Sequence, residues 1–141
     1  MAMCKVSSVQ FVRRSMIAMR EGGTGSSWTP NTDVYATDNG LVIKVELAGM
    51  RSDHLEIMVE GSRLRITGNR PDGCRAPKCS FLVMEISYGP FEVALEIPPE
   101  YDLSHARAAY LNGFLRLDVP VAEKKAHRSK VSIGDGSDAS A

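Results

Sequence analysis

Apolar and polar residues alternate with a period of two along much of the chain between residues 41 and 120. A half-buried β-strand has this period, because successive side chains point to opposite faces of the sheet. Segments 41–49, 54–61, 63–68, 91–98 and 114–120 follow it. The apolar positions that we expect to face a common core are Leu41, Ile43, Val45, Leu47, Leu55, Ile57, Val59, Leu64, Ile66, Phe91, Val93, Leu95, Ile97, Leu115, Leu117 and Val119.

Turn signals separate these segments. Asn112-Gly113 joins two alternating runs with nothing between them, and a two-residue hairpin of type I′ requires positive φ at both of its central residues. Asp38-Asn39-Gly40, Glu60-Gly61-Ser62 and Pro98-Pro99 mark further turns. Several short strands with such turns, and no strong helical segment, predict an all-β protein built as an antiparallel β-sandwich.

The chain divides into three parts by composition. Residues 1–32 form an N-terminal arm, residues 33–121 a strand-rich domain, and residues 122–141 a polar C-terminal extension. The helical pattern of the arm is weak, because Arg13 and Arg20 fall among its apolar residues. We expect both the arm and the extension to be flexible.

Two stretches fit the strand pattern less easily. Residues 69–80 are too polar and too rich in Pro and Gly for a strand, so they predict a long loop, and such loops are often functional. Residues 81–86, FLVMEI, form an apolar run directly after it. In the extension, Val131 and Ile133 stand two residues apart, so an extended chain would point both to one side, ready for two apolar pockets on a sheet edge. Chance alone could also place two β-branched residues there.

Charge and chemistry narrow the functional classes. Lys plus Arg and Asp plus Glu both total 17, so the net charge is zero, which argues against a nucleic-acid-binding protein or a coat on an anionic membrane. No apolar run is long enough to span a membrane. The three cysteines suggest a reducing, cytoplasmic setting, although the acid-poor N-terminus also suits an organellar transit peptide.

Candidate catalytic groups are sparse. The three histidines, His54, His105 and His127, are far apart in sequence and are expected to be surface residues or local caps. Cys74 and Cys79 share one loop without the second ligand pair that a zinc site needs. We therefore expect no enzymatic activity, no cofactor and no metal.

The chain resembles a bacterial-type small heat shock protein with an α-crystallin domain over 33–121. The family pattern Ala-x-x-x-Asn-Gly-x-Leu corresponds to Ala108, Asn112, Gly113 and Leu115. The segments "SYGPF" and "WTPNTDVYATDNGLVIKVELAG" resemble two further family patterns, and Val131-Ser132-Ile133 resembles the family's Ile/Val-x-Ile/Val tail anchor. The agreement runs in order across about two thirds of the chain.

The resemblance implies an immunoglobulin-like sandwich and an ATP-independent holdase, which keeps partly unfolded proteins from aggregating. It further implies a dimer formed by strand exchange, larger homo-oligomers held by the tails, and unfolded client proteins as partners. Exchange would place the run at 81–86 beside residues 32–36 of the neighbouring subunit, and so cover an exposed sheet edge.

The resemblance assigns these roles to particular residues. The exchange contacts would be Phe81, Leu82, Val83, Met84, Val34 and Tyr35. The tail anchor would be Val131 and Ile133, and its groove would be formed by Ile57, Val59 and Ala109. The arm residues expected to bind clients are Val6, Val9, Phe11, Met16 and Ile17.

Some residues depart from the family pattern. Ala48 stands where a Pro is frequent, and Ile86 and Val93 stand where arginines that help to pair subunits are usual, which leaves the dimer geometry open. Three other interpretations also remain open: a monomeric, co-chaperone-like sandwich that binds one folded partner, an enzyme built on a sandwich, and a capsid-like structural protein.

Overall fold

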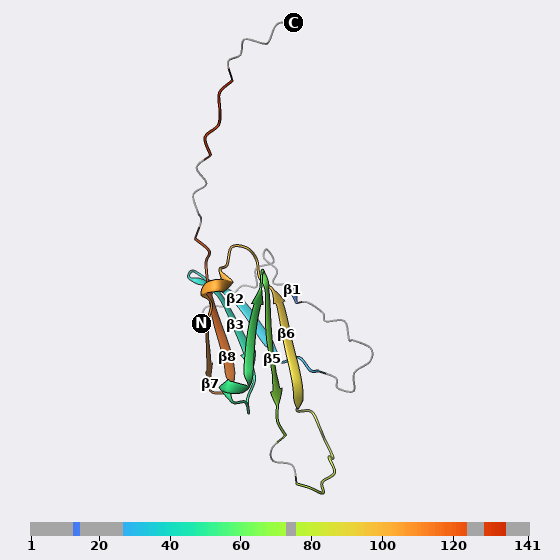
Figure 1. The fold of residues 1–141 in the computed structure, drawn as a ribbon. Helices are drawn as coiled ribbons and strands as arrows, with labels where there is room; N and C mark the ends of the chain where they lie inside the picture. Colours follow the sequence, from blue (N-terminus) through green and yellow to red (C-terminus); the bar gives the residue numbers. More distant parts are fainter. Residues whose placement is uncertain (1–12, 15–26, 73–75, 124–128, 135–141) are drawn as a thin grey trace.

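The fold is seen in a computed structural model of the chain, in which residues 13–14, 27–72, 76–123 and 129–134 are described (Figure 1). These residues contain no α-helix; they form two four-stranded sheets, each with antiparallel pairing between neighbouring strands. Sheet A has the order β1-β6-β5-β4 and sheet B the order β2-β3-β8-β7. The strands are β1 Arg13–Arg14, β2 Thr32–Thr37, β3 Gly40–Glu46, β4 Leu55–Glu60, β5 Arg63–Arg70, β6 Gly89–Glu96, β7 Arg107–Leu111 and β8 Phe114–Pro120.

The core lies between the two sheets. It contains the inward-facing apolar residues of β3 and β8 from sheet B, and those of β5 and β6 from sheet A. Ile43, Val45, Leu64, Ile66 and Val93 have no exposed surface at all. The alternation along the sequence therefore predicted β3, β5, β6 and β8 and the face that each one buries, and the β-sandwich is confirmed.

The Asn112-Gly113 hairpin has the backbone that its sequence predicts. Asn112 has φ 51° and Gly113 has φ 81°, so both residues occupy the left-handed region that a two-residue hairpin needs. A β-carbon on Gly113 would lie 3.2 Å from Ala48, and the Gly113 carbonyl accepts a hydrogen bond of 2.8 Å from the Leu47 amide. The turn therefore packs closely against the segment that follows β3.

Two sequence-based expectations need correction. The loop predicted over 69–80 begins later, because β5 continues through Arg70 and pairs Asn69 with Pro90 and Arg70 with Gly89. Val59, expected in the core, is 44% exposed. It faces inward, opposite buried Leu64, but β4 is the outermost strand of sheet A, and no further strand of the described residues covers it.

Short 3₁₀ turns lead into two of the strands: Ser52–His54 into β4, and Leu103–His105 into β7. In the part of the chain that the structure describes, no helix is long and apolar enough to cross a membrane.

Candidate assembly surfaces

The apolar run after the long loop lies outside the sandwich. In Figure 1 the chain that leads into β6, residues 76–88, projects beyond the end of the two sheets. Phe81, Leu82, Val83 and Met84 belong to no strand and are 48%, 95%, 74% and 56% exposed. Ile86 is 60% exposed. This run is thus an extended apolar surface that the single chain leaves largely uncovered.

Strand β2 is the outermost strand of sheet B on the side opposite β7, and among the described residues it pairs only with β3. Val34 lies opposite buried Ile43, faces inward and packs against the core. Tyr35 points to the outer face and is 38% exposed. A strand with one unpaired edge offers free backbone N–H and C=O groups to another strand. The predicted donor and acceptor of strand exchange are therefore both accessible in the single chain.

The opposite edge of the sandwich is open between β4 and β7. Ile57 and Val59 face inward, opposite Ile66 and Leu64, yet Ile57 is only partly buried and Val59 is exposed. On β7, Ala108 lies opposite buried Leu117, so it also faces inward, and it too is exposed. Inward-facing side chains that remain exposed on both edge strands define a groove between the sheets.

Ala109, expected in this groove, lies elsewhere. It pairs with Arg116, and directly opposed residues share a face of the sheet, so Ala109 points to the outer face of sheet B. Ala108 takes the inward position. The error is a shift of one residue, which reverses the direction of every side chain in a strand.

One end of the groove widens into a pocket of about 340 Å³. Val59 of β4 lies on one wall, and the turn Leu103–His105 that leads into β7 contributes the other. The apolar residues that line it are Val59, Ile97, Pro98, Pro99, Tyr101 and Leu103.

The described part of the extension, residues 129–134, forms no regular structure. Val131 is 81% exposed and Ile133 is 95% exposed. Neither residue is buried against the groove of its own chain. The arm residues Val6, Val9, Phe11, Met16 and Ile17, together with Cys74 and His127, lie outside the described residues, whereas Cys79 is an exposed free thiol.

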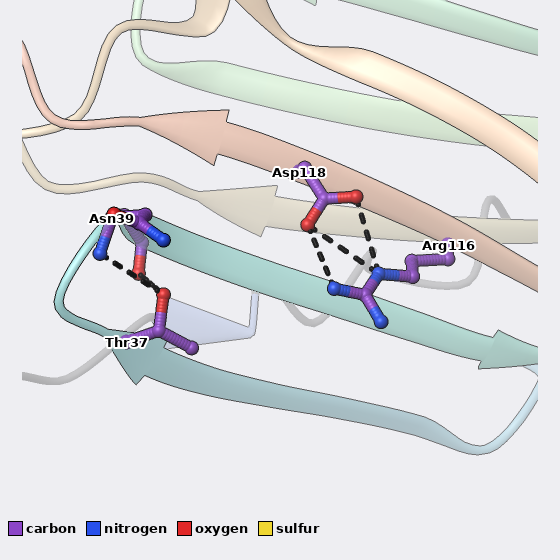
Figure 2. Close-up of polar contacts among 5 residues, drawn as sticks. Thr37, Asn39, Arg116 and Asp118 are labelled. Carbon is purple, nitrogen blue, oxygen red and sulfur yellow. Dashed lines mark hydrogen bonds and ion pairs between the residues drawn. The ribbon is translucent and has the colours of Figure 1, made fainter.

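Polar side chains on the outer face of sheet B and in the turn after β2 bond to near neighbours (Figure 2). Arg116 donates hydrogen bonds of 3.0–3.1 Å to the Asp118 carboxylate, and these bonds raise the pKa of the guanidinium further above its usual value. The Thr37 hydroxyl accepts a hydrogen bond from the backbone N–H of Asn39 at 3.3 Å and donates one to the Gly40 carbonyl at 3.2 Å. These contacts close a turn and pair two charges.

Asp102, Ser104 and His105 lie together but do not form a catalytic triad. The Asp102 carboxylate accepts from the Ser104 amide at 2.9 Å and also bonds the Ser104 hydroxyl and His105 Nδ1. The hydrogen bond from the Ser104 side chain lowers the pKa of the Asp102 carboxyl most, and the hydrogen bond from His105 lowers it further. In a triad the acid orients one ring nitrogen and the serine uses the other, whereas here both meet Nδ1. The cluster caps a turn, as expected for His105, and no group of three metal-binding side chains occurs among the described residues.

Sequence reasoning missed one cluster, at the neck of the loop. Arg70 and Trp28 stack there, with the guanidinium carbon 4.3 Å from the ring centroid. The sequence carried a weak signal, since Trp28 is the only tryptophan in the chain.

The described residues thus form an antiparallel β-sandwich with a projecting apolar loop and an exposed Val-x-Ile tail. Residues 33–134 match the model of the Hsp20/alpha crystallin family, and the chain belongs to this family. The resemblance drawn from the sequence is confirmed. Membership supports a chaperone function in general terms.

Curated relatives agree with this assignment. The chain is 30% identical to small heat shock protein IbpB of Shigella boydii over 102 residues, which cover 72% of this chain and 69% of that protein. It is 26% identical to small heat shock protein C4 of Rickettsia felis over 105 residues, 74% of this chain. The match spans only 64% of that relative's length.

Solved structures share the fold. A small heat-shock protein from Xylella fastidiosa superposes with a TM-score of 0.66 at 23% identity, covering 78% of this chain and all of that one (100%). HspA from Xanthomonas axonopodis gives a TM-score of 0.62 at 26% identity, covering 68% and 96% of the two chains.

Proposed function

We propose that the protein is an ATP-independent holdase, which binds partly unfolded proteins through apolar surface and prevents their aggregation. The observation that carries the proposal is the distribution of exposed apolar side chains. They concentrate in the segments that leave the sandwich, at residues 81–86 and at Val131 and Ile133, which are 81% and 95% exposed. Monomeric proteins rarely leave such contiguous apolar surface uncovered unless it binds something.

The proposed dimer forms by strand exchange. The run at 81–86 of one subunit pairs with the free edge of β2 in its neighbour, where Val34 and Tyr35 flank the contact on the two faces of the strand. Two observations support this pairing: among the described residues β2 pairs on one edge only, and the run is exposed and belongs to no strand of its own chain. Strand addition satisfies backbone hydrogen bonds on both partners and covers an edge that is prone to aggregation.

The proposed larger assembly forms through the tails. Val131 and Ile133 of one subunit enter the groove between β4 and β7 of another, where Ile57, Val59 and Ala108 present inward-facing, exposed side chains. Residues two apart in an extended chain share one side, which suits two neighbouring apolar sites in a single groove. Ala109 is not part of this site, because it points away from the groove.

Client proteins would bind to apolar surface that the assembly exposes in turn. We assign this role to the arm residues Val6, Val9, Phe11, Met16 and Ile17, and to the groove when tails detach. The proposed activity requires no nucleotide, because it depends on capture rather than on a driven cycle.

Light scattering from a heat-aggregating, unrelated client protein tests the proposal, with and without the full chain, in buffer free of nucleotide. A holdase suppresses the scattering at near-stoichiometric subunit ratios. Unchanged scattering at every temperature below the unfolding of the protein itself would contradict the holdase. Such a result, together with a single-chain native mass, would favour a monomeric module that binds one folded partner.

A further inference from the structure

Arg70 lies at the neck of the loop that carries the exposed run. It is the last residue of β5 and pairs with Gly89, the first residue of β6, so both ends of the loop meet beside it. Its Nε donates a hydrogen bond of 2.8 Å to the carbonyl of Ser87, the penultimate residue of the loop. One terminal nitrogen donates a longer bond of 3.4 Å to the Ala48 carbonyl, just after β3.

The same guanidinium also contacts the chain that leads into β2. It stacks 4.3 Å from the centroid of the Trp28 ring, and Tyr88 lies 5.8 Å away on the loop side. Trp28 is itself held on β6: its indole N–H donates to the Gly89 carbonyl at 3.1 Å, and its amide donates to the Pro90 carbonyl at 3.1 Å. Only three residues separate Trp28 from the first residue of β2.

Arginine suits this position better than lysine would. Its planar, delocalised cation can lie against an aromatic face while its edge donates hydrogen bonds in fixed directions. Arg70 uses both properties, since its cation lies over the Trp28 ring and its nitrogens donate to two carbonyls on different segments. The pocket beside it, about 590 Å³, is lined by residues of the loop end and of the approach to β2, among them Ile86, Tyr88 and Asn31.

We propose that Arg70 is a positioning residue for subunit exchange, joining the base of the donor loop to the approach of the acceptor strand. This inference rests on the proposed strand-exchange dimer. Within one chain the donor is the run at 81–86 and the acceptor is β2, and Arg70 contacts segments adjoining both. Arg70 holds the base of the loop in one direction. This reduces the conformational entropy that the loop loses when it pairs with a neighbour. We call the contacts of Arg70 with Ser87, Ala48 and Trp28 the clamp. Through the clamp, a subunit that donates its run at 81–86 is also better prepared to accept a neighbour's run along its own β2.

The test replaces Arg70 in the full chain carrying V131G and I133G, so that tail-mediated assembly is held constant. Sedimentation velocity across a dilution series gives the dimer dissociation constant. R70M, which removes the cation and both hydrogen bonds, should raise that constant on the order of tenfold or more. R70K, which keeps the cation but loses the planar fork, should fall between R70M and the parent.

Trp28 provides a second measurement that a purely structural role would leave unchanged. As the only tryptophan of the chain, it alone reports tryptophan emission. In the parent, this emission should change over the same dilution range in which the dimer dissociates. In R70M that coupling should be lost. The control is R51M, which removes a 75% exposed arginine that pairs with Asp53 on a different loop and should leave both measurements unaltered.

The possible results separate the clamp from the exchange itself. If R70M only lowers the thermal unfolding temperature, while its dissociation constant matches the parent, the clamp is wrong and strand exchange stands. If the parent is monomeric at every concentration, strand exchange and the clamp are both wrong. If the far-UV circular dichroism spectrum shows that R70M does not fold, R70K is compared with the parent instead. An R70K dimer with the same dissociation constant as the parent overturns the clamp.

Discussion

The core of the sandwich and the segments that leave it use the same kinds of residue in opposite settings. Ile43 and Ile66 between the sheets have 0% exposure, whereas Leu82 in the loop and Ile133 in the tail are both 95% exposed. Burying such a side chain fully is worth about 1.5–3 kcal/mol relative to leaving it in water. The core obtains this stabilisation within one chain, and the exposed segments obtain it only if another molecule covers them.

This contrast separates two kinds of information in the sequence. Alternating apolar residues between turns specify a fold that one chain completes alone. On the proposed function, apolar residues outside that alternation, in the long loop and in the polar extension, bind other molecules. Substitutions in the first group should change the stability of the subunit, and substitutions in the second should change assembly.

The largest effect on assembly is expected from the double substitution L82P/V83P. Successive N–H groups of a strand point in opposite directions, so at least one proline removes a donor that strand exchange needs. Because residues 81–86 form no strand within one chain, the subunit should keep its fold. We expect the native mass to fall to that of a single chain, measured by sedimentation velocity. The matched control, L82A/V83A, keeps both N–H groups and should weaken assembly less; equal effects of the two would contradict backbone pairing.

The next largest effect is expected from V131G/I133G in the tail. Loss of both anchors should reduce the assembly towards dimers without lowering the unfolding temperature, since both side chains are exposed in the single chain. Native mass spectrometry measures the change. S129G/S132G adds the same number of glycines to the same segment and leaves the anchors in place, so it controls for flexibility. An unchanged native mass in V131G/I133G would show that the tail does not hold the subunits together.

A core substitution should lower the stability of the subunit and leave its native mass unchanged. Leu117 is 1% exposed, and L117A should destabilise the subunit by about 2–5 kcal/mol through lost burial and a residual cavity. Denaturant unfolding measures the loss. Well below the unfolding transition the native mass should match that of the unsubstituted chain. A reduced native mass under those conditions would mean that assembly depends on the packing of the core as well as on the exposed loop and tail.

The smallest effect is expected from D102N at the end of the groove. Bonds from Ser104 and His105 lower the pKa of the Asp102 carboxyl, so its folded-state pKa lies below the unfolded value of 3.8. The carboxylate therefore adds stability above that value, and the contribution is lost as the pH falls through the folded pKa.

D102N should accordingly unfold at a slightly lower temperature than the unsubstituted chain at pH 7, because Asn still caps the turn but carries no charge. The difference should disappear as the pH falls below 3.8. Thermal unfolding at a series of pH values measures it, with D38N in an exposed turn as the charge-matched control. A gap that is constant with pH would rule out the ionised carboxylate as its source.

Much of the fold could be predicted from the sequence because strand period and turn chemistry are local properties. The Asn112-Gly113 hairpin and the buried faces of β3, β5, β6 and β8 follow from them. The end of β5 was missed, since Asn69 and Arg70 are polar and their strand conformation comes from pairing with Pro90 and Gly89.

The site was harder to predict, because it depends on register and on the position of each strand in its sheet. Ala108 and Ala109 look alike in sequence, and only the pairing with Leu117 or Arg116 decides which one faces the groove. Val59 is exposed because β4 ends its sheet, which no local pattern reveals. The Arg70–Trp28 contact joins residues from two distant segments.

The proposed assembly is best tested on the unsubstituted full chain, whose native mass can be followed by sedimentation velocity over a dilution series from micromolar concentration downwards. If the exposed loop and tail are covered by other copies of the chain, assemblies larger than a dimer should form and should pass through a dimer before single chains appear. A single-chain mass at every concentration would contradict the account, because the exposed apolar segments would then have no partner among copies of this protein.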